Sequence, residues 1–186
     1  MPPHTHRFFG VLCTALAAGI VVAANGVVAG AGDTEECERS HVRAADPRAE
    51  GAIAFGMERS PTFRSLVEAI QHSDLIVYVT AQFKMPVPLD GEIHFLTIAG
   101  EHRFLRVIVR GELSPWDRCA IVAHELQHAQ EIAAAPDVRD TPTMDALYHR
   151  IGFGVGVDRH ETDAARLVAL QVMRELSPGG KPDALR

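Results

Sequence analysis

The feature that most constrains this fold is a pair of histidines four residues apart, in the stretch V122-A123-H124-E125-L126-Q127-H128-A129. Residues at i and i+4 lie on one face of a helix, so His124 and His128 can reach the same atom. Imidazole nitrogen is a good zinc ligand, and two imidazoles on one rigid helix supply half of a tetrahedral site. Glu125 lies about 100° further round the helix, where it can accept a proton from a water that zinc activates. The HExxH spacing therefore predicts a helix with a zinc site and a base beside it.

A catalytic zinc site needs a third protein ligand and leaves one position open. Glu161 is the preferred third ligand, because the small residues A164-A165 follow it and allow two helices to approach closely. We expect Glu161 to open the last helix and to reach the metal from there. His160 is the alternative ligand, although on such a helix it points about 100° away from Glu161. Glu161 can also be an acid that favours the positive end of a helix. The preferred site holds one Zn²⁺ per chain, with the ligands His124, His128 and Glu161.

The N-terminus is a long uncharged segment. Arg7 precedes an apolar run, and no charged residue follows until Asp33. A basic start, an apolar stretch and a run of small residues predict a secretory signal peptide over residues 1–31, cleaved after Ala31. The alternative is an uncleaved membrane anchor, because the uncharged run 8–32 is long enough to span a bilayer. We therefore expect an exported protein, periplasmic or secreted, or one that the same run anchors in the membrane.

The charge of the chain argues against nucleic acid as a partner. The formal net charge is −6, and no cluster of five or more lysines and arginines occurs. Binding to phosphates requires a concentrated basic patch, so we expect no nucleic-acid partner. Two cysteines, Cys37 and Cys119, lie outside the N-terminal segment. In an exported protein such a pair can form a disulfide, and two separate thiols are an equally good interpretation.

The remaining chain divides into a lead-in, a domain and a tail. Residues 32–58 are polar and small without a sustained period, so we predict a flexible lead-in. The domain is expected over residues 59–178 and the tail over 179–186. Hydrophobic period and Ser-Pro, Thr-Pro and glycine signals predict the elements of the domain. They are a helix from Ser60-Pro61, strands 74–80, 92–98 and 104–110 with the last two as a hairpin, a helix over 115–134, a helix from Thr141-Pro142, a glycine-spaced connector at 151–157 and a final helix over 159–176. This order predicts an α+β fold, with a small sheet packed against the HExxH helix.

Two motifs together resemble the gluzincin-type zinc metallopeptidases. The stretch H124-E125-L126-Q127-H128 is followed by a glutamate in H160-E161-T162-D163-A164-A165. The expected sheet and flanking helices look like a zincin-like minimal catalytic domain. The region from Ser60 to Leu176 also resembles a group of small uncharacterised bacterial proteins classed as peptidases. The resemblance implies a peptide or protein substrate, with Glu125 as general base and His124, His128 and Glu161 as zinc ligands.

Two positions depart from the pattern of that family. Many gluzincins place an aspartate four residues after the ligand glutamate, where it orients a zinc histidine; this chain has Ala165 there. No histidine or tyrosine follows Glu161 to stabilise an oxyanion, which leaves Tyr148 and His149 as upstream candidates. Tyr148 also fits the interpretation of a buried core aromatic. These departures keep open a non-catalytic zinc-binding module. A membrane-anchored or cell-wall interaction protein, in which the histidines are incidental, is a second alternative.

Overall fold

A computed structural model of the protein describes residues 40–86, 89–156 and 159–177. These residues belong to the unit that spans residues 32–186. The predicted signal or anchor segment 1–31, the tail 179–186 and Cys37 lie outside the described residues. Among the helices that the structure describes, none is long and apolar enough to cross a membrane.

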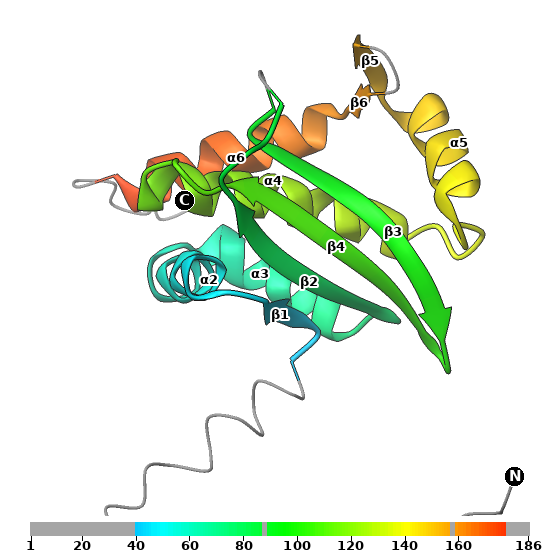
Figure 1. Ribbon diagram of the computed structural model, residues 1–186, viewed down its shortest axis with the longest axis horizontal. Coiled ribbons are helices and arrows are strands. Elements are labelled where there is room, and N and C mark those ends of the chain that lie inside the picture. Colours follow the sequence, from blue (N-terminus) through cyan, green and yellow to red (C-terminus); the bar gives the residue numbers. More distant parts are fainter. Residues whose placement is uncertain (1–39, 87–88, 157–158, 178–186) are drawn as a thin grey trace, which may run out of the picture. The chain divides into compact units, whose positions relative to one another are not determined.

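A four-stranded mixed sheet forms one layer of the domain, in the order β1-β2-β4-β3. Its strands are β1 (Val42–Ala44), β2 (Leu75–Gln82), β3 (Gly91–Ala99) and β4 (His102–Arg110). Strands β1 and β4 run parallel to β2, whereas β3 runs antiparallel to β4. The predicted hairpin is thus confirmed. It leaves β3 at the edge of the sheet, with a neighbouring strand on one side only (Figure 1).

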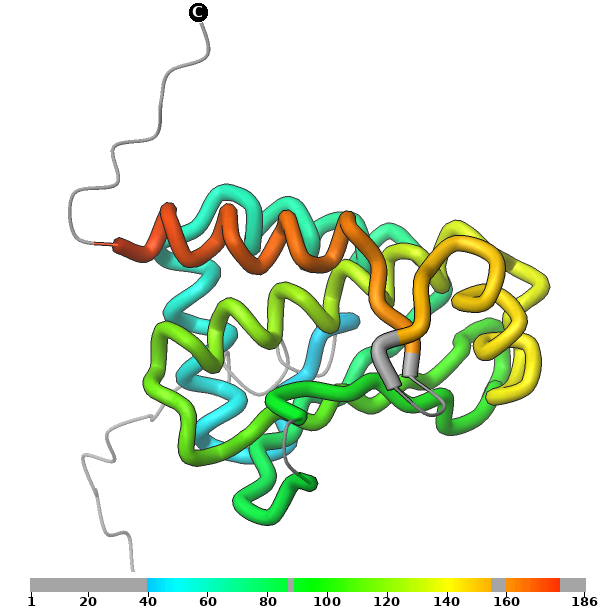
Figure 2. The backbone as a smooth tube through the Cα atoms, turned by 90° about the horizontal axis from the view of Figure 1, so that it is seen from above, coloured from blue at the N-terminus to red at the C-terminus, as the bar shows by residue number. Residues whose placement is uncertain are grey.

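The helices of the domain lie on one side of this sheet, and α4 lies between the sheet and α6 (Figures 1 and 2). They are α2 (Pro47–Arg59), α3 (Pro61–Gln71), α4 (Pro115–Ala133) and α6 (Asp163–Leu176), while α5 (Thr141–Ile151) lies near the edge strand β3. Helices α2, α3 and α4 each begin with a side chain that accepts a backbone N–H, followed by proline. This start chemistry fixes the first turn of a helix. The α+β class and the predicted helices near 61, 115 and 141 are confirmed.

Helix α4 is buried on most of its surface, because the sheet covers one side and other helices cover the rest. Val122, Leu126 and Ile132 are fully buried, and they share a single core with Val77 and Leu105 of the sheet. Cys119, at the start of the same helix, is a free buried thiol. Burial raises the pKa of this thiol to about 12, so Cys119 behaves as a core residue.

The predicted flexible lead-in over residues 32–58 is wrong in its second half. Residues 42–44 form strand β1, and helix α2 begins at Pro47 after the capping side chain of Asp46. The buried face of α2 consists of the small residues Ala49, Ala52 and Gly56. A Cβ atom at Gly56 would lie 2.6 Å from the ring of Phe63, so small residues there allow α2 to pack closely against α3. Small side chains give a weak hydrophobic period, which is why the pattern did not indicate a helix.

The predicted connector and the predicted start of the last helix are also wrong. The described part of the predicted connector, residues 151–156, is not a plain loop, because β5 (Phe153–Gly156) pairs antiparallel with β6 (Arg159–Glu161). The final helix begins at Asp163 instead of residue 159, after Thr162 in an extended conformation. The Thr162 side chain accepts the backbone N–H of Ala165 and so caps the helix. Glu161 therefore lies on a strand in front of α6 and not on the helix itself.

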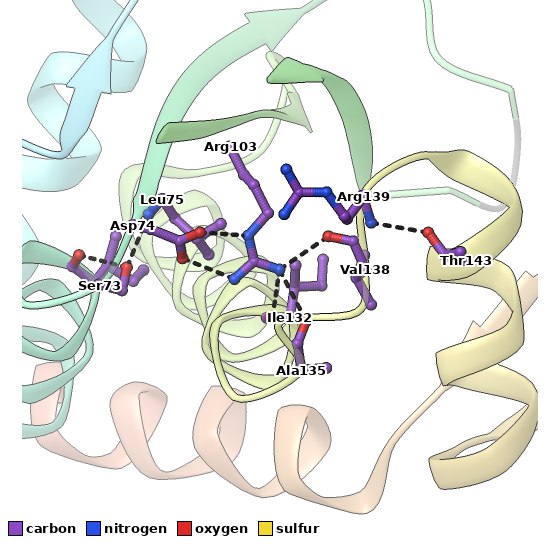
Figure 3. A network of polar contacts seen from close by, with 10 residues as sticks. Ser73, Asp74, Leu75, Arg103, Ile132, Ala135, Val138, Arg139 and Thr143 are labelled. Atoms are coloured by element: carbon purple, nitrogen blue, oxygen red, sulfur yellow. Dashed lines mark hydrogen bonds and ion pairs between the residues drawn. The ribbon is translucent and has the colours of Figure 1, made fainter. Parts of the chain in front are cut away.

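A buried arginine ties the sheet to the end of α4 (Figure 3). Arg103 on β4 donates two hydrogen bonds to the carboxylate of Asp74, each 2.7 Å long. Its Nη1 donates to the backbone carbonyls of Ile132, Ala135 and Val138, at 3.0, 2.9 and 3.0 Å. Carbonyls at the end of a helix lack the usual partner four residues on, and the guanidinium supplies a donor here beside the turn hydrogen bonds that Ile132 and Ala135 accept from the backbone. Arg103 thereby fixes the C-terminal end of α4 against the sheet.

Candidate metal centre

The structure brings together the three residues that the sequence singled out as metal ligands. One ligand atom each of His124, His128 and Glu161 lie within 4.8 Å of one another. Oε1 of Glu161 is 3.3 Å from Nε2 of His124 and 3.6 Å from Nε2 of His128. The histidines come from α4, whereas Glu161 comes from β6. This group can hold a metal ion. His160 is not part of it, and its ring contacts that of His149 with centroids 4.2 Å apart.

Glu125 is a buried carboxylate beside this group. Glu125 is 5% exposed and lines the same cleft as the three candidate ligands. Burial raises the pKa of Glu125 above its ordinary value; nearby His128 and His124 oppose this, and the carboxylates of Glu161 and Glu92 add to it. A raised pKa brings a carboxylate closer to the range in which it can both accept and return a proton.

The first residue of β3 packs directly on Glu125. A Cβ atom at Gly91 would lie 2.5 Å from Oε1 of Glu125 and 2.6 Å from Cγ2 of Ile121. Both distances are far below van der Waals contact, so a larger residue at this position would displace the carboxylate. Glycine is therefore the residue that lets the edge strand approach the HExxH helix this closely.

A cleft of about 620 Å³ contains the whole group. Its walls are formed by α4, the start of β3, α5 and β6. The lining includes the three candidate ligands and Glu125 together with Gly91 and Asp145. The cleft thus brings a group that could hold a metal ion, a buried carboxylate and an edge strand into contact with one space.

Sequence reasoning missed Glu131, the hydrogen-bond partner of a candidate ligand. Glu131 lies three residues after His128 on α4, and its Oε2 is 2.9 Å from Nδ1 of His128. A carboxylate only accepts, so Nδ1 donates and Nε2 is left to face Glu161. The signal was present in the sequence, because residues three apart are neighbours on a helix.

Tyr148, one of the two candidates for oxyanion stabilisation, is a buried core aromatic. It is 6% exposed, and its hydroxyl donates a 3.0 Å hydrogen bond to the backbone carbonyl of His128. Its ring contacts the ring of His128 edge-on, with centroids 5.2 Å apart. The second candidate, His149, is exposed on α5 and contacts His160, which lines the cleft. Tyr148 thus contacts both the backbone and the ring of His128 and helps to fix the position of that histidine.

Hydrogen bonds within the group control its ionisation. Partial burial opposes the charged form of Glu161, but hydrogen bonds from His124 and His128 outweigh it and hold the pKa of Glu161 well below its ordinary range. Burial alone would lower the pKa of His128, yet hydrogen bonds to Glu131 and Glu161 raise it to about 9. These two hydrogen bonds therefore favour the form of His128 that is protonated on both ring nitrogens when no metal is bound.

Metal binding is expected to release this extra proton. A metal ion requires the lone pair on Nε2 of His128, whereas the proton on Nδ1 stays bonded to Glu131. Because the pKa of His128 is raised to about 9, the affinity for the ion should rise by about tenfold per pH unit between pH 7 and pH 9. Calorimetric titrations in buffers of different ionisation enthalpy count the released protons. An affinity that does not change across this pH range would contradict the expectation.

Comparisons of the chain with protein-family models, with curated proteins and with solved structures return no match. None of them links the protein to the gluzincin-type metallopeptidases. The chemistry of the site therefore follows from its own geometry. Two imidazoles and a carboxylate converge on one point, a buried carboxylate lies beside them, and all four side chains line the same cleft.

Proposed function

We propose that the protein is a zinc-dependent hydrolase that cleaves peptide bonds. The observation that carries this proposal is the position of the metal-binding group and of Glu125 in one cleft. Structural zinc sites are closed by four protein ligands, whereas catalytic sites have three and keep one position open. The set of His124, His128 and Glu161 is of the second kind. It supports a catalytic site over a module that uses zinc only for stability.

Zinc suits this group better than other common ions. A tetrahedral ion with ligands at about 2.1 Å places neighbouring ligand atoms about 3.4 Å apart. The distances from Oε1 of Glu161 to the two Nε2 atoms, 3.3 and 3.6 Å, agree with this spacing. Magnesium and calcium prefer sites made of oxygen, while two imidazoles favour zinc among the abundant ions.

The reaction that we propose is hydrolysis of an amide bond. A bound zinc ion supplies polarisation of the scissile carbonyl and a lower pKa for the attacking water. Glu125 accepts a proton from that water while the oxygen of the water bonds to the carbonyl carbon. The carboxyl group of Glu125 then gives this proton to the nitrogen as the carbon–nitrogen bond breaks. The products are a carboxylic acid and an amine, which account for every atom of the peptide and the water.

Strand β3 is the proposed binding edge for the substrate. It has a neighbouring strand on one side only, and its first residues, Gly91 to His94, line the cleft. An extended peptide can add to such an edge as a further strand, with main-chain hydrogen bonds along its length. Because Gly91 lies against Glu125, a peptide on β3 would run past the base. An edge strand beside the HExxH helix also supports a zincin-like fold and the gluzincin resemblance.

Metal analysis followed by a cleavage assay tests the proposed function. We expect close to one zinc ion per chain and cleavage of members of a peptide library. A chelator should stop cleavage, and added zinc should restore it. His124→Ala removes one of three ligands and should lose both the metal and the cleavage. A chain that binds zinc tightly but cleaves no peptide would instead support the non-catalytic module.

A further inference from the structure

Glu131 contacts two different elements of the metal centre with its two carboxylate oxygens. Oε2 accepts the 2.9 Å hydrogen bond from Nδ1 of His128 on α4. Oε1 accepts a 2.8 Å hydrogen bond from Oγ1 of Thr162, the residue that follows Glu161. The Glu131 side chain is 12% exposed, so solvent replaces these bonds poorly. One carboxylate thus binds both the helix with two ligands and the segment with the third.

Thr162 passes this contact on to Glu161. Its backbone N–H donates a 2.8 Å hydrogen bond to Oε1 of Glu161, the oxygen that faces both histidines. Its hydroxyl accepts the backbone N–H of Ala165 at 3.2 Å, which caps α6. A hydroxyl can donate only one hydrogen bond, and the hydroxyl of Thr162 donates it to Glu131. The position of Thr162, and with it that of Glu161, is therefore set by Glu131 from one side and by α6 from the other.

We propose that Glu131 is a positioning residue that holds the two halves of the metal centre in register. Towards His128, it fixes the tautomer and the ring orientation that direct Nε2 at the ion. Towards Thr162, it fixes the segment that carries Glu161. Ala165, where many gluzincins have an aspartate, is buried and offers no such group. In this chain the supporting carboxylate comes instead from the HExxH helix itself. The inference rests on the proposed zinc binding but not on the proposed peptide cleavage.

Zinc affinity and the visible absorption of the Co²⁺-substituted protein test this role, since neither depends on turnover. Glu131→Gln should weaken zinc binding by about 10–100-fold, the usual effect of losing such a partner. It should also change the Co²⁺ spectrum, because the ligand geometry relaxes. Thr162→Val removes the bridging hydroxyl at nearly constant volume and should weaken binding in the same direction. Thr162→Ser keeps the hydroxyl and should stay near wild type.

Glu175→Gln is the matched control. Glu175 also accepts a hydrogen bond from a threonine hydroxyl at the start of a helix, from Thr62 at 2.7 Å, but it is not part of the metal centre. It should change the stability of the protein without changing the affinity for zinc.

Two results would overturn the proposal. One is zinc affinity and a Co²⁺ spectrum in Glu131→Gln equal to those of the wild type. The other concerns the double variant Glu131→Gln, Thr162→Val. If both residues act through one hydrogen bond, the double variant should lose less affinity than the two single losses multiplied. Losses that multiply in full would show independent roles. A wild-type chain that binds no zinc would be a different outcome, because it would overturn the proposed function and, with it, this inference.

Discussion

Glu125→Gln is expected to abolish peptide cleavage while zinc stays bound. The substitution keeps the size and polarity of the side chain, and Glu125 is not one of the three candidate ligands. It removes the group that accepts the proton of the attacking water. The expected loss of kcat is at least about 10²–10⁴-fold, the usual contribution of a positioned general base. The measurement is the rate of cleavage of one peptide substrate, together with the zinc content of the same preparation.

Glu161→Gln provides the contrast, because it removes an anionic ligand and not the base. Zinc affinity and activity should fall together in this variant, and added zinc should partly restore turnover. Glu68→Gln, an exposed glutamate on α3, controls for the loss of one negative charge and should match the wild type. The catalytic interpretation fails if Glu125→Gln cleaves as fast as the wild type. The ligand assignment fails if Glu161→Gln binds zinc normally and His160→Ala does not.

Arg103→Met is expected to lower the free energy of unfolding by roughly 3–5 kcal/mol, the usual cost of breaking a buried ion pair from one side. Arg103 is 2% exposed, and its removal takes one donor away from each of the buried carbonyls of Ile132, Ala135 and Val138. The first two carbonyls keep a backbone N–H partner, from Ala135 and Val138. Asp74 is partly exposed and can regain water, which places the expected loss towards the lower end of the range. Urea unfolding of the metal-free protein gives the measurement.

Arg106→Met is the matched control for this prediction. Arg106 lies on the same strand, but its side chain is exposed, so the substitution should change stability by no more than about 0.5 kcal/mol.

The dependence of stability on acid pH provides a second test of the role of Arg103. The hydrogen bond from Arg103 lowers the pKa of Asp74 below 3.8, so its contribution is present above that pH and is lost as the pH falls further. The difference between wild type and Arg103→Met should therefore shrink in strong acid. Equal losses in the two arginine variants would contradict the assigned role.

Local sequence chemistry predicted the HExxH helix and most of its neighbours. Helices α3 and α4 begin at a serine followed by proline, and α5 begins at a threonine followed by proline, so the start of each is visible in a few adjacent residues. The abundance of β-branched residues in β2 and β4 predicted strands in the same way. The placement of His124 and His128 on one face needed only the helical repeat.

Features that depend on how one element packs on or pairs with another were not predicted. Helix α2 is held by the close fit of Gly56 against Phe63, and this fit has no hydrophobic period. Strand β6 exists because it pairs with β5, so Glu161 was proposed as a ligand but on the wrong element. The bond from Arg103 to Asp74, just before β2, and the bond from Glu131 to Thr162 join segments that are distant in the sequence. Such pairs follow from the topology, which the sequence pattern constrains only weakly.

The division of the proposed ligands between α4 and β6 would determine when an ion can be captured during folding. In an unfolded chain the two histidines alone hold an ion weakly, since recruiting Glu161 means closing the long loop between them. Only the folded domain therefore binds the ion with high affinity, and this binding increases the free energy of unfolding. Partial opening at the β6 end would separate Glu161 from the histidines while α4 stays intact in the core. The site should thus assemble last when the domain folds, and it should lose its ion before the rest of the domain unfolds.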